Sequence, residues 1–498
     1  MMFLVRAAAV LALSLLLVAG AGAATRADST RLAAPTHVHA FLLRADEQSD
    51  NTFSRTPAFA WRPVRGASRY LFRLGTSTAW AANAVWWSSQ TTVPAMSVPV
   101  ALPWITGEPY SLYAQVRGIA PDGSKGPWSK PFGFNMRWST TPAQTDAPPG
   151  LVRWTTVDGA TAYEVWYVDA GRLIRTTTNV ADEREFYGAA AVPGPARWRV
   201  RAVREIYNHV SNGLPAASHG PWSPIYTSAD PASTTGALTP AESVSDIVST
   251  ARTEGSHQLM PGFAFDGDTS LEGAPASAYR VYVATDSDCV NTVFRGDTVS
   301  SPAYAPRVFD VPYAGVDADL SAGTSTPRDL WDTDSSTGGY YWTVVAVADA
   351  AAGETGRELD VPQDACTGGH VRTFRRTSNP AVASKTNVPY ASGLSPSGRL
   401  LAATRTRPRF YGTPLVSWQP ALAATAYEVQ WSKTSAFSPV AGRLTTRATS
   451  AVLPLRPGTW WYRVRGLNPG VPGASHAMNW SSLPASLRVA QPTFKIAG

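Results

Sequence analysis

The hexapeptide ATAYEV occurs at residues 160–165 and again at residues 424–429. Each copy belongs to a longer pattern in which a tryptophan stands nine positions before a tyrosine. The pairs are Trp61 and Tyr70, Trp154 and Tyr163, and Trp418 and Tyr427. A looser copy has Phe263 and Phe265 ahead of Tyr279. Because fixed spacing in distant parts of a chain is typical of duplicated modules, the chain is predicted to consist of repeats.

Each of these tyrosines opens a run in which side chains alternate between two faces. In the second copy, Tyr163 and Val165 share one face and Glu164 points the other way. Period-two alternation predicts a half-buried antiparallel strand, and the segment around each tryptophan is predicted to be the strand before it. Every copy then has a second strong strand pattern, and three copies close with a Trp-Ser pair. The second strand patterns span residues 110–118, 196–203, 340–347 and 460–467.

This order of motifs resembles the fibronectin type III module, a seven-stranded β-sandwich of roughly 100 residues. The resemblance implies that the tryptophans occupy the core of the second strand and the tyrosines that of the third. The implied core residues are Trp61, Tyr70, Trp154, Tyr163, Tyr279, Trp418 and Tyr427. The third copy is the most divergent, since it has no matching tryptophan and carries a long insertion between Cys289 and Tyr340.

The fold class predicted from these patterns is all-β, with four tandem sandwiches after a signal peptide. A chain of 498 residues is too long for one hydrophobic core. Polar stretches rich in proline and alanine separate the copies and favour a beads-on-a-string arrangement. The predicted units are a signal peptide at 1–24, repeat 1 at 32–139, repeat 2 at 140–230, repeat 3 at 241–378 and repeat 4 at 399–492.

The amino-terminal segment predicts export. Arg6 precedes an apolar run from Ala7 to Ala19 and then small residues that suit a signal peptidase. The run is shorter than the ~20 residues that span a bilayer, so no membrane span is expected. We therefore expect a secreted, extracellular or cell-surface protein, and the prevalence of arginine and alanine over lysine favours a bacterial source. In an oxidising compartment, Cys289 and Cys366 are expected to form a disulfide.

The Trp-Ser pairs resemble those of the cytokine-receptor variant of this fold, in which tryptophans stack between strand arginines. If Val116 points inward, its neighbour Arg117 points outward, where Trp128 can cover it. The corresponding arginine and tryptophan pairs are Arg201 with Trp222 and Arg465 with Trp480. Each cation–π contact of this kind is worth about 0.5 to 2 kcal/mol. The motif is interpreted as structural because it recurs in three repeats.

Adjacent tryptophans at Trp86 and Trp87 are the candidate ligand contacts. Neighbours in a strand face opposite sides, so one of the two indoles is expected at the surface. A flat exposed ring there can stack on a sugar, which gives the alternative hypothesis of a carbohydrate-binding accessory protein. Trp104, Trp138 and Trp460 are more isolated cases.

Catalytic and cofactor motifs do not emerge from the sequence. The acidic clusters at 266–268, 286–288 and 332–334 lack the glycine and glutamate spacing of an EF-hand. Ser475 precedes His476 in a loop without a nucleophile elbow, and no phosphate-binding or dinucleotide fingerprint appears. We therefore expect no cofactor, no metal and no catalytic residues. An enzyme with an unrecognised site in the repeat 3 insertion is the second alternative.

The net charge of +7 comes from basic residues that are mostly dispersed, so nucleic acid is not an expected partner. The leading hypothesis is a non-enzymatic spacer, adhesin or protein-interaction scaffold. Its partner would be an extracellular protein or a cell-wall polysaccharide. The expected contact regions are the repeat 3 insertion and the loop at 204–223 of repeat 2.

Overall fold

The all-β expectation is confirmed by the structure, a computed structural model. It describes residues 32–43, 51–182, 195–205, 217–228, 234–244, 256–257, 260–305, 309–311, 339–348, 356–376, 401–404, 407–411, 414–422, 424–468, 476–481 and 485–490. Within these ranges strands predominate, and the only helices are η1 (Ala82–Ala84) and α1 (Pro362–Thr367). Neither is long and apolar enough to cross a membrane. The predicted signal peptide, residues 1–24, lies outside the described residues.

Each repeat contributes one small antiparallel sheet. Repeat 1 forms it from β1 (His39–Phe41), β3 (Ala58–Ala60) and β6 (Ala95–Ser97). Repeat 2 uses β10 (Gln144–Thr145), β11 (Leu151–Trp154) and β14 (Val180–Asp182). Repeat 3 uses β18 (Thr239–Val244), β20 (Gly262–Asp266) and β23 (Ala303–Tyr304). Repeat 4 uses β30 (Leu415–Ser417) and β33 (Ser450–Val452).

A larger sheet packs on each small one, and its central strands carry the predicted alternating runs. Repeat 1 orders β2 (Thr52–Phe53), β9 (Phe132–Met136), β7 (Leu112–Ile119), β4 (Arg69–Gly75) and β5 (Val85–Thr91), with β8 (Lys125–Trp128) beside β7. Repeat 2 orders β16 (Ala217–His219), β15 (Arg197–Glu205), β12 (Ala162–Tyr167) and β13 (Arg172–Thr176), with β17 (Tyr226–Thr227) beside β15.

The larger sheets of the other two repeats follow the same plan. Repeat 3 orders β19 (Ser256–His257), β27 (Arg372–Arg376), β25 (Gly339–Ala348), β21 (Ala278–Ala284) and β22 (Thr292–Arg295), with β26 (Arg357–Glu358) beside β25. Repeat 4 orders β28 (Leu401–Thr404), β29 (Arg407–Tyr411), β36 (Ala485–Ala490), β34 (Gly458–Asn468), β31 (Ala426–Ser432) and β32 (Gly442–Thr446), with β35 (His476–Ala477) beside β34. Two-sheet β-sandwiches therefore build the molecule, as the resemblance implied.

The repeated aromatic pair lies in the core between the two sheets. Trp61 and Tyr70 meet edge to face with ring centroids 5.3 Å apart, and Trp154–Tyr163 and Trp418–Tyr427 have the same geometry at 5.6 Å. In these three repeats the tyrosine hydroxyl also accepts a hydrogen bond from a backbone amide six residues upstream. The donors are Val64, Val157 and Ala421. The conserved spacing thus fixes both a core contact and the turn between the two strands.

Repeat 3 replaces this arrangement in part. Phe265 takes the place of the tryptophan, 5.3 Å from the Tyr279 ring. Tyr279 is only half-buried, unlike the other three tyrosines, and no hydrogen bond of its hydroxyl to a described residue accompanies the ring contact. The expectation that Tyr279 is a core residue of the same kind is therefore corrected, because a phenylalanine fills less space than a tryptophan and the turn is built differently.

Repeats 1 and 4 pack against each other through their small sheets. In β3 the side chain of Phe59 points into repeat 1, while Ala58 and Ala60 point outward and are still buried. These outward alanines pack in one cluster with Leu415 of repeat 4, and Val452 borders it. Hydrogen bonds of Ser97 and Ser450 across the interface add polar contacts. Both faces of the repeat 1 small sheet are thus covered.

Repeats 2 and 3 pack in the same way. Leu151 and Val180 of repeat 2 share a buried cluster with Ala264 and Ala303 of repeat 3. Strand β24 (Phe309–Val311), which belongs to the sequence of repeat 3, pairs antiparallel with β13 of repeat 2. A part of the repeat 3 insertion therefore extends the large sheet of the preceding repeat.

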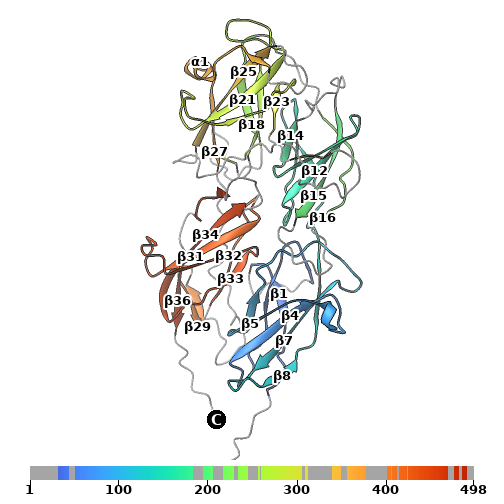
Figure 1. Cartoon of the computed structure of the whole chain (residues 1–498), viewed down its shortest axis with the longest axis vertical. Coiled ribbons are helices and arrows are strands. Elements are labelled where there is room, and N and C mark those ends of the chain that lie inside the picture. The colour runs from blue at the N-terminus through green and yellow to red at the C-terminus, as the bar shows by residue number, and fades with distance from the viewer. Residues whose placement is uncertain are drawn as a thin grey trace, which may run out of the picture.

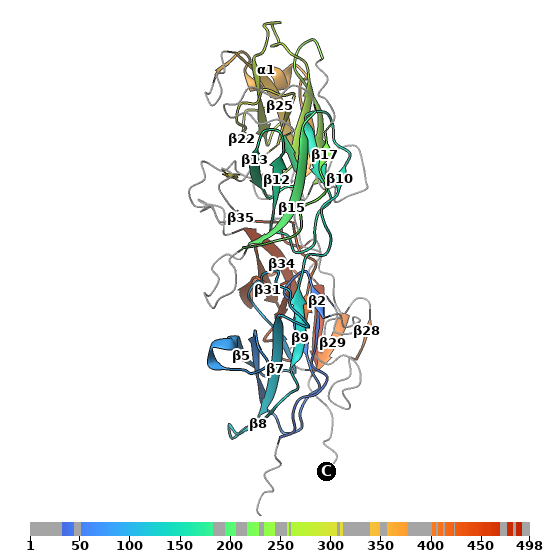
Figure 2. The ribbon, with the colours of Figure 1, turned by 90° about the vertical axis from the view of Figure 1, so that its right-hand side faces the viewer.

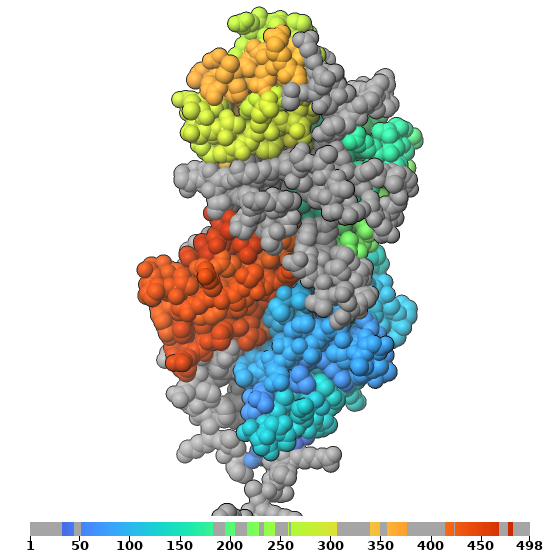
Figure 3. All heavy atoms as spheres, in the orientation of Figure 1, coloured from blue at the N-terminus to red at the C-terminus, as the bar shows by residue number. Residues whose placement is uncertain are grey.

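The beads-on-a-string arrangement is consequently wrong. The chain runs upward through repeats 1 and 2, crosses to repeat 3 and returns through repeat 4, which lies beside repeat 1 (Figures 1 and 2). In the space-filling view, repeats 1 and 4 abut directly (Figure 3). The physical reason is the apolar outer face of the small sheets, which water would otherwise cover at a cost of about 25 cal/mol per Å².

Candidate ligand-binding site

A cavity of about 400 Å³ lies where repeats 1, 2 and 4 meet. Repeat 1 lines it with Arg55, and repeat 2 with residues 156–161 and Arg204. Repeat 4 contributes two loops, at residues 420–427 and 447–449. Because the loops at the ends of three sandwiches converge here, we name this place the three-repeat junction.

Arg204 is the most deeply buried cation of the three-repeat junction, with 6% of its surface exposed. From strand β15 its Nε atom donates to the carbonyl oxygen of Leu102 at 2.6 Å, and Nη1 donates to that of Gly159 at 2.8 Å. Burial lowers the pKa of Arg204 to about 10; Asp158 opposes this shift and the charge of Arg55 adds to it. The guanidinium thus stays protonated at neutral pH. Its Nη2 atom makes no hydrogen bond to any described residue.

Arg55, which is 7% exposed, connects all three repeats. Its Nε atom lies 2.8 Å from a carboxylate oxygen of Asp158 in repeat 2. Its Nη1 atom donates to the Thr449 hydroxyl of repeat 4 at 3.0 Å. The Asp158 carboxylate also accepts a hydrogen bond from Ser54. Asp158, the one carboxylate among the described residues that line the cavity, is therefore already engaged by Arg55 and Ser54.

Two hydroxyl groups of repeat 4 also line the cavity. The Oγ1 atom of Thr425 is buried and has no hydrogen-bond partner among the described residues. The Tyr427 hydroxyl accepts a hydrogen bond from the Ala421 amide, and burial raises the pKa of Tyr427 well above its usual range. Both groups therefore keep their protons at neutral pH. With Arg447 also on the wall, the described lining residues include three arginines and one aspartate.

The Trp-Ser motifs are found where the sequence placed them, on the outer face of the large sheets. Arg117 stacks on Trp128 at 4.4 Å, and Arg73 covers the same ring at 3.9 Å. The equivalent stacks join Arg199 and Arg201 with Trp222, and Arg463 and Arg465 with Trp480. The predicted cation–π stacking is confirmed, and a second arginine, on the neighbouring strand or two residues away, completes each stack.

Hydrogen bonds of the serine to a neighbouring strand explain why a serine follows the tryptophan in each motif. In repeat 2 the Ser223 amide donates to the Val200 carbonyl at 2.8 Å, and its hydroxyl accepts from the Val200 amide at 3.0 Å. Ser129 with Val116 and Ser481 with Val464 repeat this pair of bonds. A single residue thus satisfies both backbone groups of a buried valine. The motif holds the last strand to the sheet, which is a structural role.

Trp86 and Trp87, the predicted ligand contacts, are not displayed as expected. Trp86 is buried at 9% exposure, and Trp87 is half-buried with its ring 6.2 Å from that of Phe72. The reason is a register shift: Leu74 pairs with Trp87 and Gly75 with Val85, so Trp86 is an extra residue in the edge strand. Such a bulge breaks strict alternation, and both indoles can then turn away from water. The expectation of one exposed indole is wrong.

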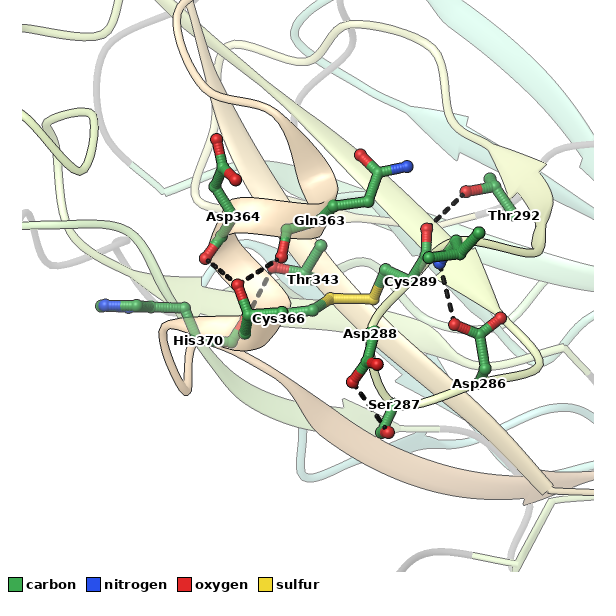
Figure 4. The surroundings of a disulfide bond; sticks show 12 residues. Asp286, Ser287, Asp288, Cys289, Thr292, Thr343, Gln363, Asp364, Cys366 and His370 are labelled. Carbon is green, nitrogen blue, oxygen red and sulfur yellow. Dashed lines mark hydrogen bonds between the residues drawn. A yellow bond between two sulfur atoms is a disulfide. The ribbon is translucent and has the colours of Figure 1, made fainter.

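Cys289 and Cys366 form the predicted disulfide, which closes a separation of 77 residues. Figure 4 shows it joining the loop after β21 to helix α1. The Asp286 carboxylate accepts hydrogen bonds from the amides of Val290 and Asn291, and so caps the same loop. This acidic residue therefore has a local structural role. Val290 and Val361 beside the disulfide are exposed apolar residues.

Other candidate regions are only partly described. The described residues hold no cluster of three or more histidine, cysteine, aspartate or glutamate side chains suited to a metal ion. Residues 332–334, most of the repeat 3 insertion, Ser475 and residues 206–216 of the repeat 2 loop lie outside the described residues. The isolated tryptophans have structural contacts: Trp104 packs edge to face with Trp138, and Lys433 lies over Trp460.

Sequence reasoning did not find the three-repeat junction. Arg55 and Arg204 are 149 positions apart and belong to different repeats, so no local motif connects them. One signal was present: Arg204 lies near the end of an alternating strand, where the equivalent positions of repeats 1 and 4 hold the uncharged residues Ala120 and Asn468. A charge at the end of a core strand indicates a neighbouring surface that accepts it.

No protein-family model matches the chain, and no curated protein sequence matches it either. One solved structure that matches is the crystal structure of chicken CNTN1 FN1–FN3 domains, at 11% sequence identity and a TM-score of 0.16. The match covers 71% of this chain and 100% of that chain.

Proposed function

We propose that this protein is a secreted or cell-surface binding scaffold without catalytic activity, built from four fibronectin type III-like modules. In this proposal the modules form one rigid body rather than a flexible rod. The partner is an extracellular protein or a cell-wall polysaccharide. The protein would hold that partner through loops and cavities at the ends of its sandwiches.

The observation that carries the proposal is the position of Arg55. One buried side chain of repeat 1 pairs with Asp158 of repeat 2 and donates to Thr449 of repeat 4. Contacts between residues almost 400 positions apart fix the relative orientation of the repeats. A fixed orientation favours binding, because less freedom is lost when a partner docks.

The proposal is tested by co-sedimentation of the purified protein with isolated cell envelopes and with insoluble polysaccharides. We expect saturable pelleting with at least one of these materials. Arg55→Met should weaken pelleting and enlarge the radius of gyration measured by small-angle X-ray scattering, because it releases the three-repeat junction. Arg62→Met serves as the control, since Arg62 is an exposed arginine of the same repeat.

Two results would contradict the proposal. The first is the absence of pelleting with every envelope and polysaccharide preparation. The second is release of soluble fragments from a pelleted polysaccharide, which would indicate an enzyme.

A further inference from the structure

We propose that the cavity at the three-repeat junction binds the oxyanion group, carboxylate or phosphate, of a small ligand. The inference deepens the proposed function and rests on it, because it assigns a ligand class to one site of the binding scaffold. It concerns a cavity of about 400 Å³, within the range of small-molecule sites.

The first argument is charge. A buried cation is costly unless an anion or a full set of hydrogen bonds compensates it. Arg55 has the Asp158 carboxylate at 2.8 Å, whereas the hydrogen bonds of Arg204 to described residues go to two neutral carbonyl oxygens and the Asp158 charge acts on it without a direct hydrogen bond. Repulsion from Arg55 acts on Arg204 in the same direction as burial. An oxyanion in the cavity would supply the missing negative charge.

The second argument is the supply of free donors. The Nη2 atoms of Arg55 and Arg204 make no hydrogen bond to described residues, and both side chains line the cavity. The Thr425 hydroxyl on the same wall is buried and unpaired within the described part of the chain. Guanidinium groups match the planar or tetrahedral oxygens of carboxylate and phosphate better than they match chloride. The donors thus select an oxyanion rather than any anion.

The third argument concerns the ligand's size. Sulfate-sized ions would leave most of the cavity unfilled, whereas a sugar acid or a sugar phosphate would also reach the threonine-rich walls. The walls offer the hydroxyls of Thr140, Thr156 and Thr425. These groups are suited to hydroxylated ligands. The apolar residues of the same walls, among them Val157, Pro420 and Leu422, would contact the carbon skeleton of such a ligand.

The test is isothermal titration calorimetry of the purified protein at pH 7 and low ionic strength. The probes are inorganic phosphate and D-glucuronate, with D-glucose as the neutral comparison. We expect saturable binding of at least one anionic probe, weakened as salt is added, and no binding of glucose. Binding of phosphate alone assigns a phosphate-bearing ligand, and binding of glucuronate alone assigns a carboxylate-bearing ligand.

Variants locate the binding. Arg204→Met should weaken the affinity for the probe at least tenfold. Arg197→Met should leave this affinity unchanged, because Arg197 lies on the same strand but is exposed and paired with Asp169. If Arg204→Met does not fold, Thr140→Glu replaces it, because Thr140 is an exposed residue of the cavity rim. The added carboxylate should repel the anionic probe and weaken its affinity about three- to tenfold.

Failure takes two forms. No heat of binding from either anionic probe at millimolar concentration would overturn the inference, and so would binding that neither cavity variant weakens. Neither result affects pelleting with envelopes, so a failure of this inference is distinguishable from a failure of the proposed function.

Discussion

The Nε atom of Arg204 donates a hydrogen bond of 2.6 Å to the carbonyl oxygen of Leu102, so a buried cation of repeat 2 is fixed to the backbone of repeat 1. Two residues further along, the Trp104 amide donates to the Ser218 hydroxyl at 2.8 Å. Arg204 and Ser218 lie opposite each other on paired strands. Separation of the two repeats would therefore break several buried hydrogen bonds at once, each worth about 0.5 to 1.5 kcal/mol.

The contact of repeats 2 and 3 should be sensitive to a single methyl group. Gly150 has φ +86°, and a Cβ atom there would lie 2.8 Å from the Ala303 Cβ. Gly123 has a similar φ of +88° with no atom within 4 Å. Both Gly→Ala changes strain the backbone, but only Gly150→Ala forces the interface apart. We expect it to cost about 1 to 3 kcal/mol more than Gly123→Ala, measured by urea unfolding. Equal losses would show that the interface is loose.

The hydroxyl of the repeated tyrosine should contribute to the free energy of unfolding in the repeats where it accepts a hydrogen bond from a backbone amide. Tyr70→Phe leaves the Val64 amide without its acceptor, and we expect a loss of about 1 to 2 kcal/mol. Tyr279→Phe in repeat 3 removes no hydrogen bond to a described residue and should cost at most about 0.5 kcal/mol. Hydrogen exchange at the Val64 amide is the sharper readout, since Tyr70→Phe should accelerate it. Unchanged exchange there would contradict this role of the hydroxyl.

The motif serine should matter more than an exposed strand serine. Ser223→Ala leaves the buried Val200 amide unpaired, with an expected cost of about 1 to 2 kcal/mol. Ser88→Ala is the matched control, because Ser88 lies exposed in an edge strand. Thermal unfolding followed by tryptophan fluorescence compares the two variants. If Ser88→Ala costs as much as Ser223→Ala, the motif has no special role.

Repeat 2 should show an acid-sensitive ion pair at Glu164. Burial alone would raise the pKa of Glu164, but His219, with its Nε2 atom 3.5 Å from the carboxylate, and the charges of Arg175 and Arg201 together hold the pKa well below the usual range. A lowered folded-state pKa stabilises the fold above the unfolded-state pKa of about 4.3, and this contribution is lost as pH falls further. Glu164→Gln should therefore cost about 3 kcal/mol at pH 7 and progressively less below about pH 5.

Urea unfolding between pH 7 and pH 3 measures this dependence. Asp169→Asn provides the control, because Asp169 pairs with Arg197 at the surface, where solvent screens the interaction. The wild type should lose its advantage over Glu164→Gln as pH falls, with no matching change for Asp169→Asn. A Glu164→Gln penalty that is constant with pH would show that packing, not charge, is responsible.

The strands and their core aromatics could be predicted because local spacing encodes them. The distance from Trp154 to Tyr163 fixes one turn and two strands, and the predicted export signal made the disulfide of Cys289 and Cys366 the expected pairing. The packing of repeats could not be predicted in the same way. In AFA at residues 58–60 the two alanines form a buried outer face. Alanine is compatible with either environment, so the pattern alone did not indicate an interface.

The site was less accessible to prediction than the fold. Trp86 and Trp87 were predicted as ligand contacts because neighbours in a strand face opposite sides, but the bulge opposite Gly75 leaves Trp86 buried and Trp87 half-buried. Arg55 and Arg204 are ordinary residues in their own repeats and acquire significance only when repeat 4 closes the junction. The chemistry of the three-repeat junction depends on residues that are far apart in the sequence and meet only in the folded chain. Patterns within a single sequence do not show which distant residues meet.

Because repeat 4 packs on repeat 1, the interface between them can form only after most of the chain has been synthesised. Ser97 and Ser450 hydrogen-bond across a separation of 353 residues. At about 5 to 20 residues per second, the ribosome needs roughly 20 to 70 s between the two. Throughout that interval the outer alanines of the first small sheet face solvent or a chaperone. Small side chains at those positions limit the apolar surface that is exposed before repeat 4 has been synthesised. They thereby limit aggregation with other incompletely synthesised chains.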